Sequence, residues 1–495
     1  MDRLLLLSYI RAATCFLGLC LLPVTGTLSA GGCTSVRVGS LEENPPLPTA
    51  GLLQQWQRVS AESGEAHHGL LTLDQAIEEA LRGSPELEQI RQRVAAAGQQ
   101  VRLADASFYP RLVVAEDFNV TDNPVFALMN IINQRRLQSD VNFNNPGKQH
   151  NFSTQIRGEW SLFEGGSRWY KRKALLDQHR SMEADLLAAR NSMVAEVSKT
   201  YYRWLQALDF IGVAEKALES AKTDERLGEA RVRAETALPS ELLRLKARAA
   251  EVHGNLVMAR TAARRLQAAM ERLLVRTISP EEIPQATVSI SPATLESLAE
   301  DPHSLVEQAL DKRPELSAVR SLILAARRRV RSAQGGFLPS LGTQARYQWD
   351  SEDFSDSADS WLVGVQATWT LFEGGTTLAA ISEARVRLKE MEARGQQVAL
   401  DIALEVHQAT LAVQEAAERI RVAAERKKYA QSALEEVRNL YRNQVVLVDA
   451  LLQAEVAWNQ AEVSYTSALF EGKIAQALLR QSLGEFAQWM GMAHE

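Results

Sequence analysis

Four stretches of the chain alternate apolar and polar residues at every second position, which is the pattern of β-strands with one apolar face. The clearest is WLVGVQATWTL, from Trp361 to Leu371, in which Trp, Val, Ala and Leu side chains oppose Gly, Gln and Thr. NFSTQIRGEWSL and LGTQARYQWD follow the same rule, while RLVVAEDFNV alternates less well because Glu116 falls on its apolar face. The sequence therefore predicts four strands in two pairs.

Two interpretations of these strands compete. The sheet is either soluble, with its polar face in water, or it lies in a membrane, with its apolar face toward lipid and its polar face toward a lumen. Tryptophans at the strand ends (Trp160, Trp349, Trp361 and Trp369) favour the membrane, because aromatic residues concentrate at membrane interfaces. Four strands cannot close a barrel, and an open sheet edge is not viable in lipid. A membrane sheet would therefore have to close by oligomerisation.

Two long stretches have the periodicity of helices. No proline lies between Gly166 and Pro239, and none follows Pro339. Apolar residues recur in these stretches at close to coiled-coil spacing. The first seam comprises Met182, Leu186, Ala189, Met193, Val197, Tyr201, Trp204, Leu208 and Ile211, and the second includes Ile381, Val398, Ile402, Val406, Val413 and Ile420. Each stretch is interrupted once, at ETALPSELL and at YRNQVVLVDALL, which predicts two long helical hairpins.

The chain is an internal duplication. WSLFEGG begins at Trp160 and WTLFEGG at Trp369, and each motif follows a strand pair and precedes a helical hairpin. The expected domains are a signal peptide at 1–32, an N-terminal periplasmic segment at 33–69, a first repeat at 70–274, a linker with little regular structure at 275–304 and a second repeat at 305–495.

The N-terminus has the pattern of a secretory signal peptide, with the apolar run AATCFLGLCLL followed by the small residues GTLSAGGC. Cleavage after Ala30 is one interpretation, and a lipoprotein signal with the lipid on Cys33 is the other. Because all three cysteines (Cys15, Cys20 and Cys33) lie in this region, the body of the chain has no cysteine framework. No later stretch is long and apolar enough for a membrane-spanning helix.

Composition narrows the function classes. The 495 residues are 46% hydrophobic and 23% charged, which is typical neither of disorder nor of a polytopic helical membrane protein. A net charge of −6 argues against a nucleic-acid partner. The sequence has no phosphate-binding loop, nucleophile motif, paired catalytic carboxylates or metal-ligand cluster. We therefore predict no catalytic residue, no cofactor and no metal site, and expect that the protein is not an enzyme.

The duplicated strand pairs, the proline before each first strand (Pro110 and Pro339) and the two LFEGG motifs resemble the TolC-like outer-membrane efflux proteins, the outer membrane factors of tripartite systems. The resemblance implies an α+β fold of two strand-strand-helical hairpin units. Three copies would form a 12-stranded transmembrane β-barrel, with four strands per subunit, continued by a long α-helical periplasmic tunnel. This homotrimer would lie in the outer-membrane lipid of a Gram-negative bacterium.

The implied function is passive. The channel would be the exit duct for substrates that an inner-membrane efflux pump delivers through a periplasmic adaptor (membrane fusion) protein. Two alternatives remain, a type I protein secretion duct and a non-channel periplasmic coiled-coil scaffold or adaptor.

The resemblance also assigns a role to the glycines of the repeated motif. Gly165, Gly166, Gly374 and Gly375 would supply the backbone freedom that turns a strand into a long helix. The long segment from Thr121 to His150, which joins the first strand pair, would be an extracellular loop.

In the resembling family, acidic rings constrict the pore at the helix turns. The usual pattern of two aspartates three positions apart is represented by Asp449 alone, because Leu452 occupies the second position. We expect Glu241, in the first repeat, to form mixed rings with Asp449, and Tyr441 and Arg442 to latch the closed state by bonding across the turn. The alternative is that these acids merely cap helix starts.

Overall fold

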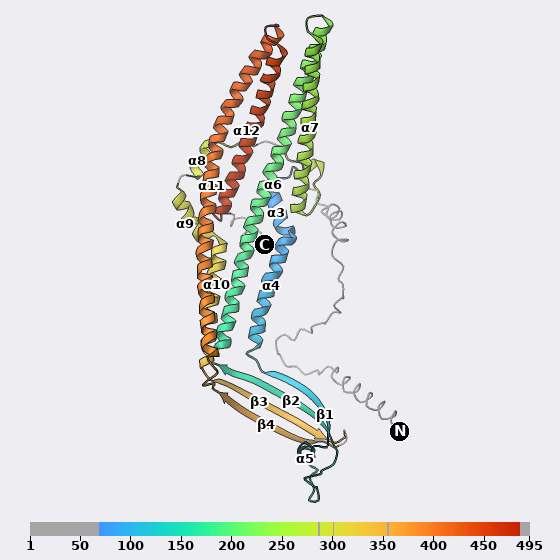
Figure 1. The fold of residues 1–495 in the computed structure, drawn as a ribbon, viewed down its shortest axis with the longest axis vertical. Coiled ribbons are helices and arrows are strands. Elements are labelled where there is room, and N and C mark those ends of the chain that lie inside the picture. The colour runs from blue at the N-terminus through green and yellow to red at the C-terminus, as the bar shows by residue number, and fades with distance from the viewer. Residues whose placement is uncertain (1–68, 286–287, 300, 354–355, 486–495) are drawn as a thin grey trace, which may run out of the picture. The chain divides into compact units, whose positions relative to one another are not determined.

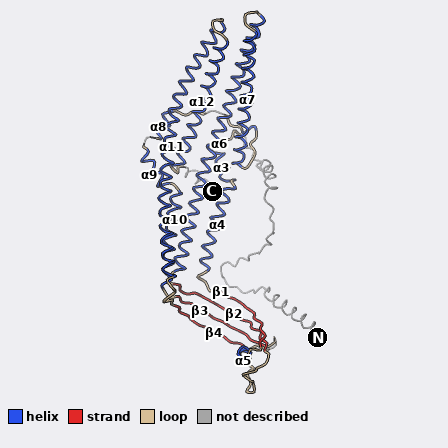
Figure 2. Tube along the Cα trace, in the orientation of Figure 1, coloured by secondary structure: helices blue, strands red, loops and turns tan. Residues whose placement is uncertain are grey.

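The structure is a computed structural model, which describes residues 69–285, 288–299, 301–353 and 356–485. All of them belong to one of two compact units, Trp56–Glu495. The predicted signal peptide, Cys33 and nearly all of the N-terminal segment lie outside the described residues. The described part consists of long helices and one four-stranded sheet, as Figure 1 and Figure 2 show.

The predicted duplication is confirmed, because both halves run through the same order of elements apart from α5 in the first half and η2 in the second. The first half contains α3 (Leu73–Gly83), α4 (Pro85–Ala106), β1 (Arg111–Thr121), α5 (Pro124–Asn133), β2 (Gln149–Glu164), α6 (Ser167–Arg233) and α7 (Pro239–Leu274). The second contains α9 (Pro302–Lys312), α10 (Pro314–Gln334), η2 (Gly335–Phe337), β3 (Ser340–Ser351), β4 (Ala358–Thr368), α11 (Thr376–Arg442) and α12 (Val448–Ser482). Helices α6 and α11 have 67 residues each, or about 100 Å of helix.

Local sequence sets where the helices begin. Pro85, Pro239 and Pro314 are the first residues of α4, α7 and α10, where the missing N–H costs nothing. Ser84 caps α4 by accepting a hydrogen bond from the Leu87 N–H. These signals are short-range, so each of these helix starts is set by residues close to it in the sequence.

The sheet is antiparallel throughout, in the order β1-β2-β3-β4. Arg111 pairs with Glu159 in the first hairpin, and Ser340 pairs with Thr368 in the second. These four residues hold equivalent positions in the two repeats, so the hairpins share one register. Strands β1 and β4 are the two edges of the sheet.

The end of β4 corrects the sequence prediction. We expected the strand to run from Trp361 to Leu371, but it ends at Thr368. The equivalent strand β2 continues to Glu164, because β3 pairs with its last residues. Strand β4 lacks such a neighbour beyond Thr368, since β3 begins at Ser340, its partner. A strand without a partner loses the hydrogen bonds that would extend it.

The two faces of the sheet differ as the alternation predicted. The apolar face is exposed and includes Leu112, Val114, Phe118, Ile156, Trp361, Val363 and Val365. The polar face includes the buried residues Asn151, Ser153, Gln155 and Asp350. Glu116, which broke the alternation of the first strand, accepts a hydrogen bond from the hydroxyl of the opposite residue, Thr154.

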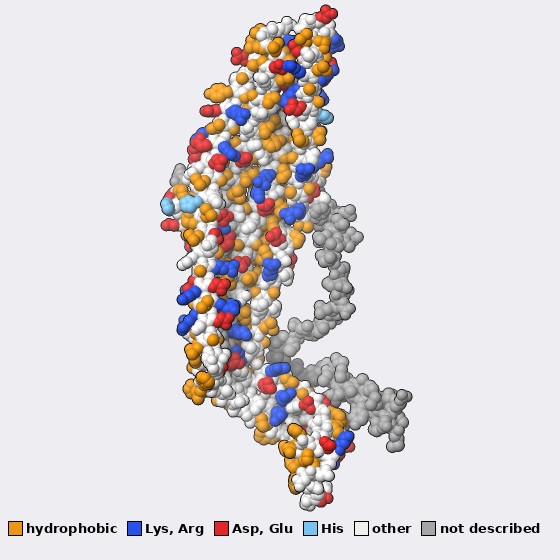
Figure 3. All heavy atoms as spheres, viewed as in Figure 1, with side chains coloured by type: hydrophobic (Ala, Val, Ile, Leu, Met, Phe, Trp, Pro, Cys, Tyr) orange, Lys and Arg blue, Asp and Glu red, His pale blue; other side chains and the backbone are white. Residues whose placement is uncertain are grey.

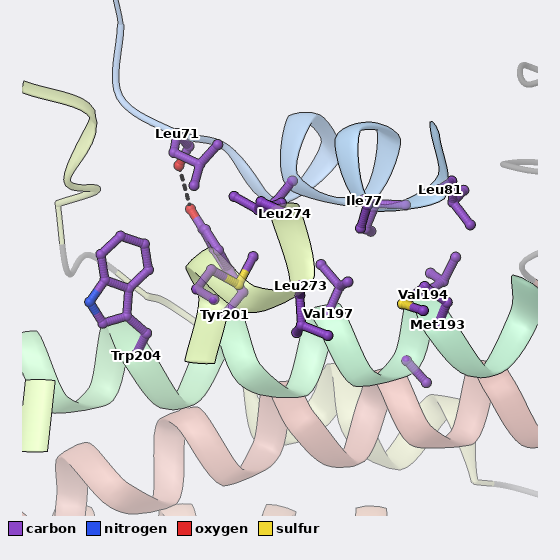
Figure 4. Packing of buried hydrophobic residues seen from close by; sticks show 14 of the residues in the cluster. Leu71, Ile77, Leu81, Met193, Val194, Val197, Tyr201, Trp204, Leu273 and Leu274 are labelled. Atoms are coloured by element: carbon purple, nitrogen blue, oxygen red, sulfur yellow. Dashed lines mark hydrogen bonds between the residues drawn. The ribbon is translucent and has the colours of Figure 1, made fainter. Parts of the chain in front are cut away.

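The helices pack around two main apolar clusters. In the first, shown in Figure 4, apolar side chains of α3, α6 and the end of α7 pack together, Trp204 of α6 is fully buried, and the Tyr201 hydroxyl donates to the Leu71 carbonyl at 2.9 Å. The second lies between α11 and α12 and includes Leu295. Among the described residues, no helix combines the length and the apolar character needed to cross a membrane. Figure 3 shows basic and acidic side chains interspersed along the helices.

The linker between the repeats has more regular structure than we predicted. It contains η1 (Pro280–Glu282) and the short helix α8 (Pro292–Leu298). Leu295 of α8 is fully buried against the second apolar cluster. This tertiary contact stabilises a helix that its proline-rich surroundings did not predict.

Candidate functional site at the helix turns

The two long hairpins turn at the end of the helices away from the sheet (Figure 1). Each first helix ends in a left-handed residue, Glu235 with φ 56° after α6 and Gln444 with φ 63° after α11. These residues hold equivalent positions in the repeats, so both turns have the same backbone plan. The differences between the turns therefore come from side chains.

Asp449 joins the two hairpins. It is the second residue of α12, and its carboxylate forms an ion pair with Arg244 of α7. Both side chains are about half exposed. The hydrogen bond to Asp449 and the attraction of its charge hold the pKa of Arg244 above its usual value. The pair is thus a water-accessible bridge between repeats.

Glu241 lies one position farther along its helix than Asp449 does. It is the third residue of α7, and Ser240 stands at the second, which corresponds to Asp449 in α12. One position along a helix changes the direction of the side chain by about 100°. The two acids are therefore not equivalent relative to their helix starts.

Tyr441 and Arg442 meet the other hairpin through their backbone. The guanidinium of Arg231, on α6, donates to both main-chain carbonyls at 2.9 Å. It also lies 4.5 Å over the Tyr441 ring. The Tyr441 side chain is buried, and burial raises the pKa of its hydroxyl. Arg231 thereby caps the C-terminus of α11 and fastens it to α6.

A buried polar cluster lies farther from the turns. Arg438 of α11 donates to Ser220 of α6 at 2.7 Å and to Glu455 of α12 at 3.1 Å, and it is 3.9 Å from the Asp224 carboxylate. Burial and the neighbouring Glu455 raise the pKa of Asp224 to about 7. A cavity of about 220 Å³ borders Ser220, Arg438 and Glu455. The cluster couples three helices from both repeats.

The glycine motifs form the junction between sheet and helices. The backbone is left-handed at Gly165, Gly166, Gly374 and Gly375, with φ of 60°, 78°, 66° and 87°. Residues with a side chain rarely adopt this conformation. Gly166 and Gly375 are the N-caps of α6 and α11, so each glycine pair spans the change from strand to helix.

Sequence reasoning missed Arg231, Arg244, Asp224, Arg438 and Glu455. Each is one charged residue on a helix rich in charges, and none lies in a motif. Their partners are distant in sequence, as Arg244 and Asp449 are, 205 positions apart. Within the part of the chain that the structure describes, no cluster of three or more His, Cys, Asp or Glu side chains is placed to hold a metal ion.

Solved structures share this fold. The chain is similar to the outer membrane protein VceC of Vibrio cholerae, at 20% identity and a TM-score of 0.69, over 87% of this chain and 98% of that one. It is similar to the CmeC outer membrane channel of Campylobacter jejuni, at 16% and 0.70, over 83% and 85%. It also resembles the open state of the MtrE outer membrane channel of Neisseria gonorrhoeae, at 18% and 0.68, over 83% and 88%.

The sequence itself matches a family model. Comparison with curated proteins gives no match, but the model of the outer membrane efflux protein family matches residues 76–275 and 305–485, which is more than half of the chain. This match confirms the predictions of efflux and of an outer-membrane location, with the helices as the periplasmic extension. With the duplicated fold in place, the chain belongs to the outer membrane efflux protein family.

Proposed function

We propose that the protein is the passive exit duct of a tripartite efflux system. Three copies would close one 12-stranded barrel, and their helices would form a tunnel across the periplasm. An inner-membrane pump would supply the energy, and a periplasmic adaptor would join the pump to the helices. The observation that carries this proposal is a difference between the repeats. The second repeat packs against the first and covers it, but no described part of the chain covers the second repeat in the equivalent way.

The sheet edges give the first support. Within the described residues, strands β1 and β4 are unpaired on their outer sides, and the apolar face of the sheet is exposed. In lipid, each unpaired backbone group costs several kcal/mol, roughly, so an edge must find a partner. Pairing β4 of one copy with β1 of the next removes both edges.

The duplication predicts the register of that pairing. Strand β2 joins β3 with Ile156 opposite Tyr347, and Trp160 opposite Thr343. The equivalent residues at the outer edges are Val365 with Phe118, and Trp369 with Val114. In this register the unpaired residues after Thr368 would gain a partner strand and extend β4.

The helices give independent support. On α6, Asp177 is buried beside Arg328 of α10, and Asn191 is buried with its amide donating to the Gln481 carbonyl of α12. The same positions of α11 carry Val386 and Leu400, each 66% exposed. Apolar side chains therefore stand exposed where the first repeat is covered by the second. The first repeat of a second copy would cover them.

Disulfide cross-linking tests the assembly. We expect a chain carrying Val365→Cys and Phe118→Cys to form disulfide-linked multimers when outer membranes are oxidised, because directly opposite Cβ atoms lie about 5 Å apart. Val365→Cys with Val120→Cys, shifted by two residues, is the matched control, and each single-cysteine chain shows the background from native cysteines. Equal cross-linking of the two pairs would refute the register, and none from either pair would refute the barrel.

We further propose that the turns hold the duct closed. The Asp449–Arg244 pair and the bonds from Arg231 to the end of α11 tie the hairpins together, and Asp449 of three copies would bring negative charge into a narrow pore. Glu241 lies one position farther along its helix than Asp449 does, so it would contribute less to this closure.

Single-channel conductance in planar bilayers tests this closure. Asp449→Ala should raise the conductance several-fold and weaken its cation selectivity, since it removes both the bridge and the charge. Glu241→Gln is the control, with a smaller expected effect. A conductance indifferent to Asp449→Ala would place the closure elsewhere while leaving the duct intact.

A further inference from the structure

Helix α5, within the long loop after β1, has an apolar face that the described residues leave exposed. Asn123 caps its start, where its side-chain oxygen accepts from the Val125 N–H at 3.1 Å. One face of α5 is buried through Ala127, Asn130 and Ile131. The opposite face is exposed and consists of Val125, Phe126, Met129 and Ile132, with exposed fractions of 68%, 65%, 49% and 41%. Helices of soluble regions normally turn such a face toward a core.

The buried face is anchored on the polar side of the sheet. Asn130 donates to the Asn119 side chain at 2.8 Å, and Gln134, just after the helix, donates to the Asn151 side chain at 2.9 Å. Asn119 and Asn151 are directly opposite each other, and Asn151 donates to Asp350. These residues share the sheet face that carries Ser153 and Gln155, not the exposed apolar face.

Further contacts hold the segment after α5 against the second repeat. Arg135 donates to the Asp359 carbonyl at 2.8 Å, and Arg136 forms an ion pair with Glu352. The loop is therefore fixed to both strand hairpins at the end of the sheet away from the helices (Figure 1). Its position belongs to the fold of the sheet, so the loop cannot turn to the lipid side without breaking these bonds.

The polar side of the sheet is the lumen side in the proposed barrel, which limits what can cover α5. Lipid lies on the other side of the wall. Twelve strands spaced about 4.8 Å apart and tilted by about 40° give a backbone radius of about 12 Å. Three helices of about 10 Å diameter in mutual contact fill a circle of about 11 Å radius. Three copies of α5 on the inner wall would therefore touch.

We propose that the α5 helices of three copies meet near the pore axis and narrow the extracellular mouth with an apolar plug. The partner of each exposed face is the same face of the neighbouring copies. Val125 and Met129 lie at the centre of this face, and Phe126, at its edge, is its one aromatic side chain. Contact between these faces would restrict water at the axis. The inference rests on the proposed trimeric barrel and adds a second closure, opposite the one at the helix turns.

Cysteine cross-linking separates the plug from the assembly. A chain with Met129→Cys should form disulfide-linked dimers in oxidised outer membranes, because three copies of this residue would converge. Val363→Cys is the control, since that side chain is more exposed than Met129 but lies on the apolar outer face. If the Val365/Phe118 cysteine pair cross-links and Met129→Cys does not, the plug is refuted and the barrel stands. If neither cross-links, the barrel fails and the plug with it.

Conductance gives a second readout that does not depend on disulfide chemistry. In a background opened at the turns by Asp449→Ala, Phe126→Asn with Met129→Asn should raise the conductance at least twofold, because a wetted mouth resists the passage of ions less than an apolar one. Met129→Leu keeps the face apolar and should change little. Both positions are exposed in the single chain, so folding should tolerate the polar side chains. An unchanged conductance in the double variant would overturn the plug.

Discussion

The two copies of the Trp-x-Leu-Phe-Glu-Gly-Gly motif have the same local structure and different surroundings. In each, the indole N–H donates to a backbone carbonyl just before the first strand of its repeat, from Trp160 to Phe108 at 2.8 Å and from Trp369 to Phe337 at 3.1 Å. Short-range sequence explains this likeness. The first motif is then covered by the second repeat, and the second motif is left open.

The difference is large for identical residues. Leu162 and Phe163 are each 44% exposed, whereas Leu371 and Phe372 are 80% and 88% exposed. Gly165 lies against the Gly335 backbone, while a Cβ built at the equivalent glycine would meet nothing within 4 Å. In this duplicated chain the second repeat covers part of the first, while the equivalent surface of the second repeat stays exposed. That exposed surface is the physical basis for proposing a closed ring of chains.

The largest difference between the two motifs is expected when their first glycines are substituted. Gly165→Ala and Gly374→Ala both place a side chain at a left-handed φ, at a cost of about 1–2 kcal/mol. At Gly165 the new Cβ would also lie 2.1 Å from the Gly335 carbonyl oxygen. We expect Gly165→Ala to lose about 4 kcal/mol or more, measured by thermal unfolding in detergent.

Packing of a neighbouring chain against the second motif should not make the stability losses of Gly165→Ala and Gly374→Ala equal. Ala106 occupies the position in the first repeat that corresponds to Gly335, so a neighbouring chain cannot approach Gly374 as closely as Gly335 approaches Gly165. Equal losses for the two variants would show that φ strain alone decides, and that the packing difference is irrelevant to stability.

Substituting the phenylalanine of each motif, Phe163 or Phe372, should have an effect of intermediate size. Phe372→Ser should leave the single chain folded but lower the temperature at which trimers dissociate, since burial of this side chain in a neighbour is worth about 2 kcal/mol. Phe163→Ser should instead lower the unfolding temperature, because Phe163 pairs with Leu341 inside the chain. Semi-native gel electrophoresis and circular dichroism, read on both variants, distinguish these outcomes. Identical behaviour of the pair would contradict the assignment.

The smallest expected effect concerns pH at a position where the repeats differ in charge. Asp224 is buried, with its pKa raised to about 7, and its equivalent in α11 is Ala433. Because the folded chain holds a proton that the unfolded chain releases near pH 4, stability falls as pH rises from about 4 to about 7.

Between pH 6 and pH 8 the expected loss at this site is about 1 kcal/mol per chain. Asp224→Asn should flatten the corresponding fall in unfolding temperature, and Glu225→Gln, next to it on α6, should not. A fall of the same size in Asp224→Asn would assign the pH dependence to other groups.

Much of the fold was readable from local signals. The alternation predicted all four strands, the two interrupted proline-free stretches predicted the helical hairpins, and the paired motifs revealed the duplication. Where prediction failed, a neighbour decided the outcome. Strand β4 stops at Thr368 for want of a partner strand, and α8 forms because Leu295 is buried against α11 and α12. Neither neighbour is adjacent in sequence.

The candidate site shows the same limit. The sequence picked out Asp449, Tyr441 and Arg442 but not the arginines that bind them, because the hairpins meet side by side and their residues are far apart in the chain. Charged residues crowd these helices, so spacing alone does not select a pair.

By itself, the sequence determined which segments are strands and helices, where the long helices begin and that the unit occurs twice, because caps, prolines, glycines and periodicity act over a few residues. Only the tertiary structure decided that Arg244 meets Asp449, that Asp224 is buried beside Glu455, and that α5 lies on the polar side of the sheet. Those contacts depend on how long rigid helices and paired strands align across the repeats, and no local preference encodes that alignment.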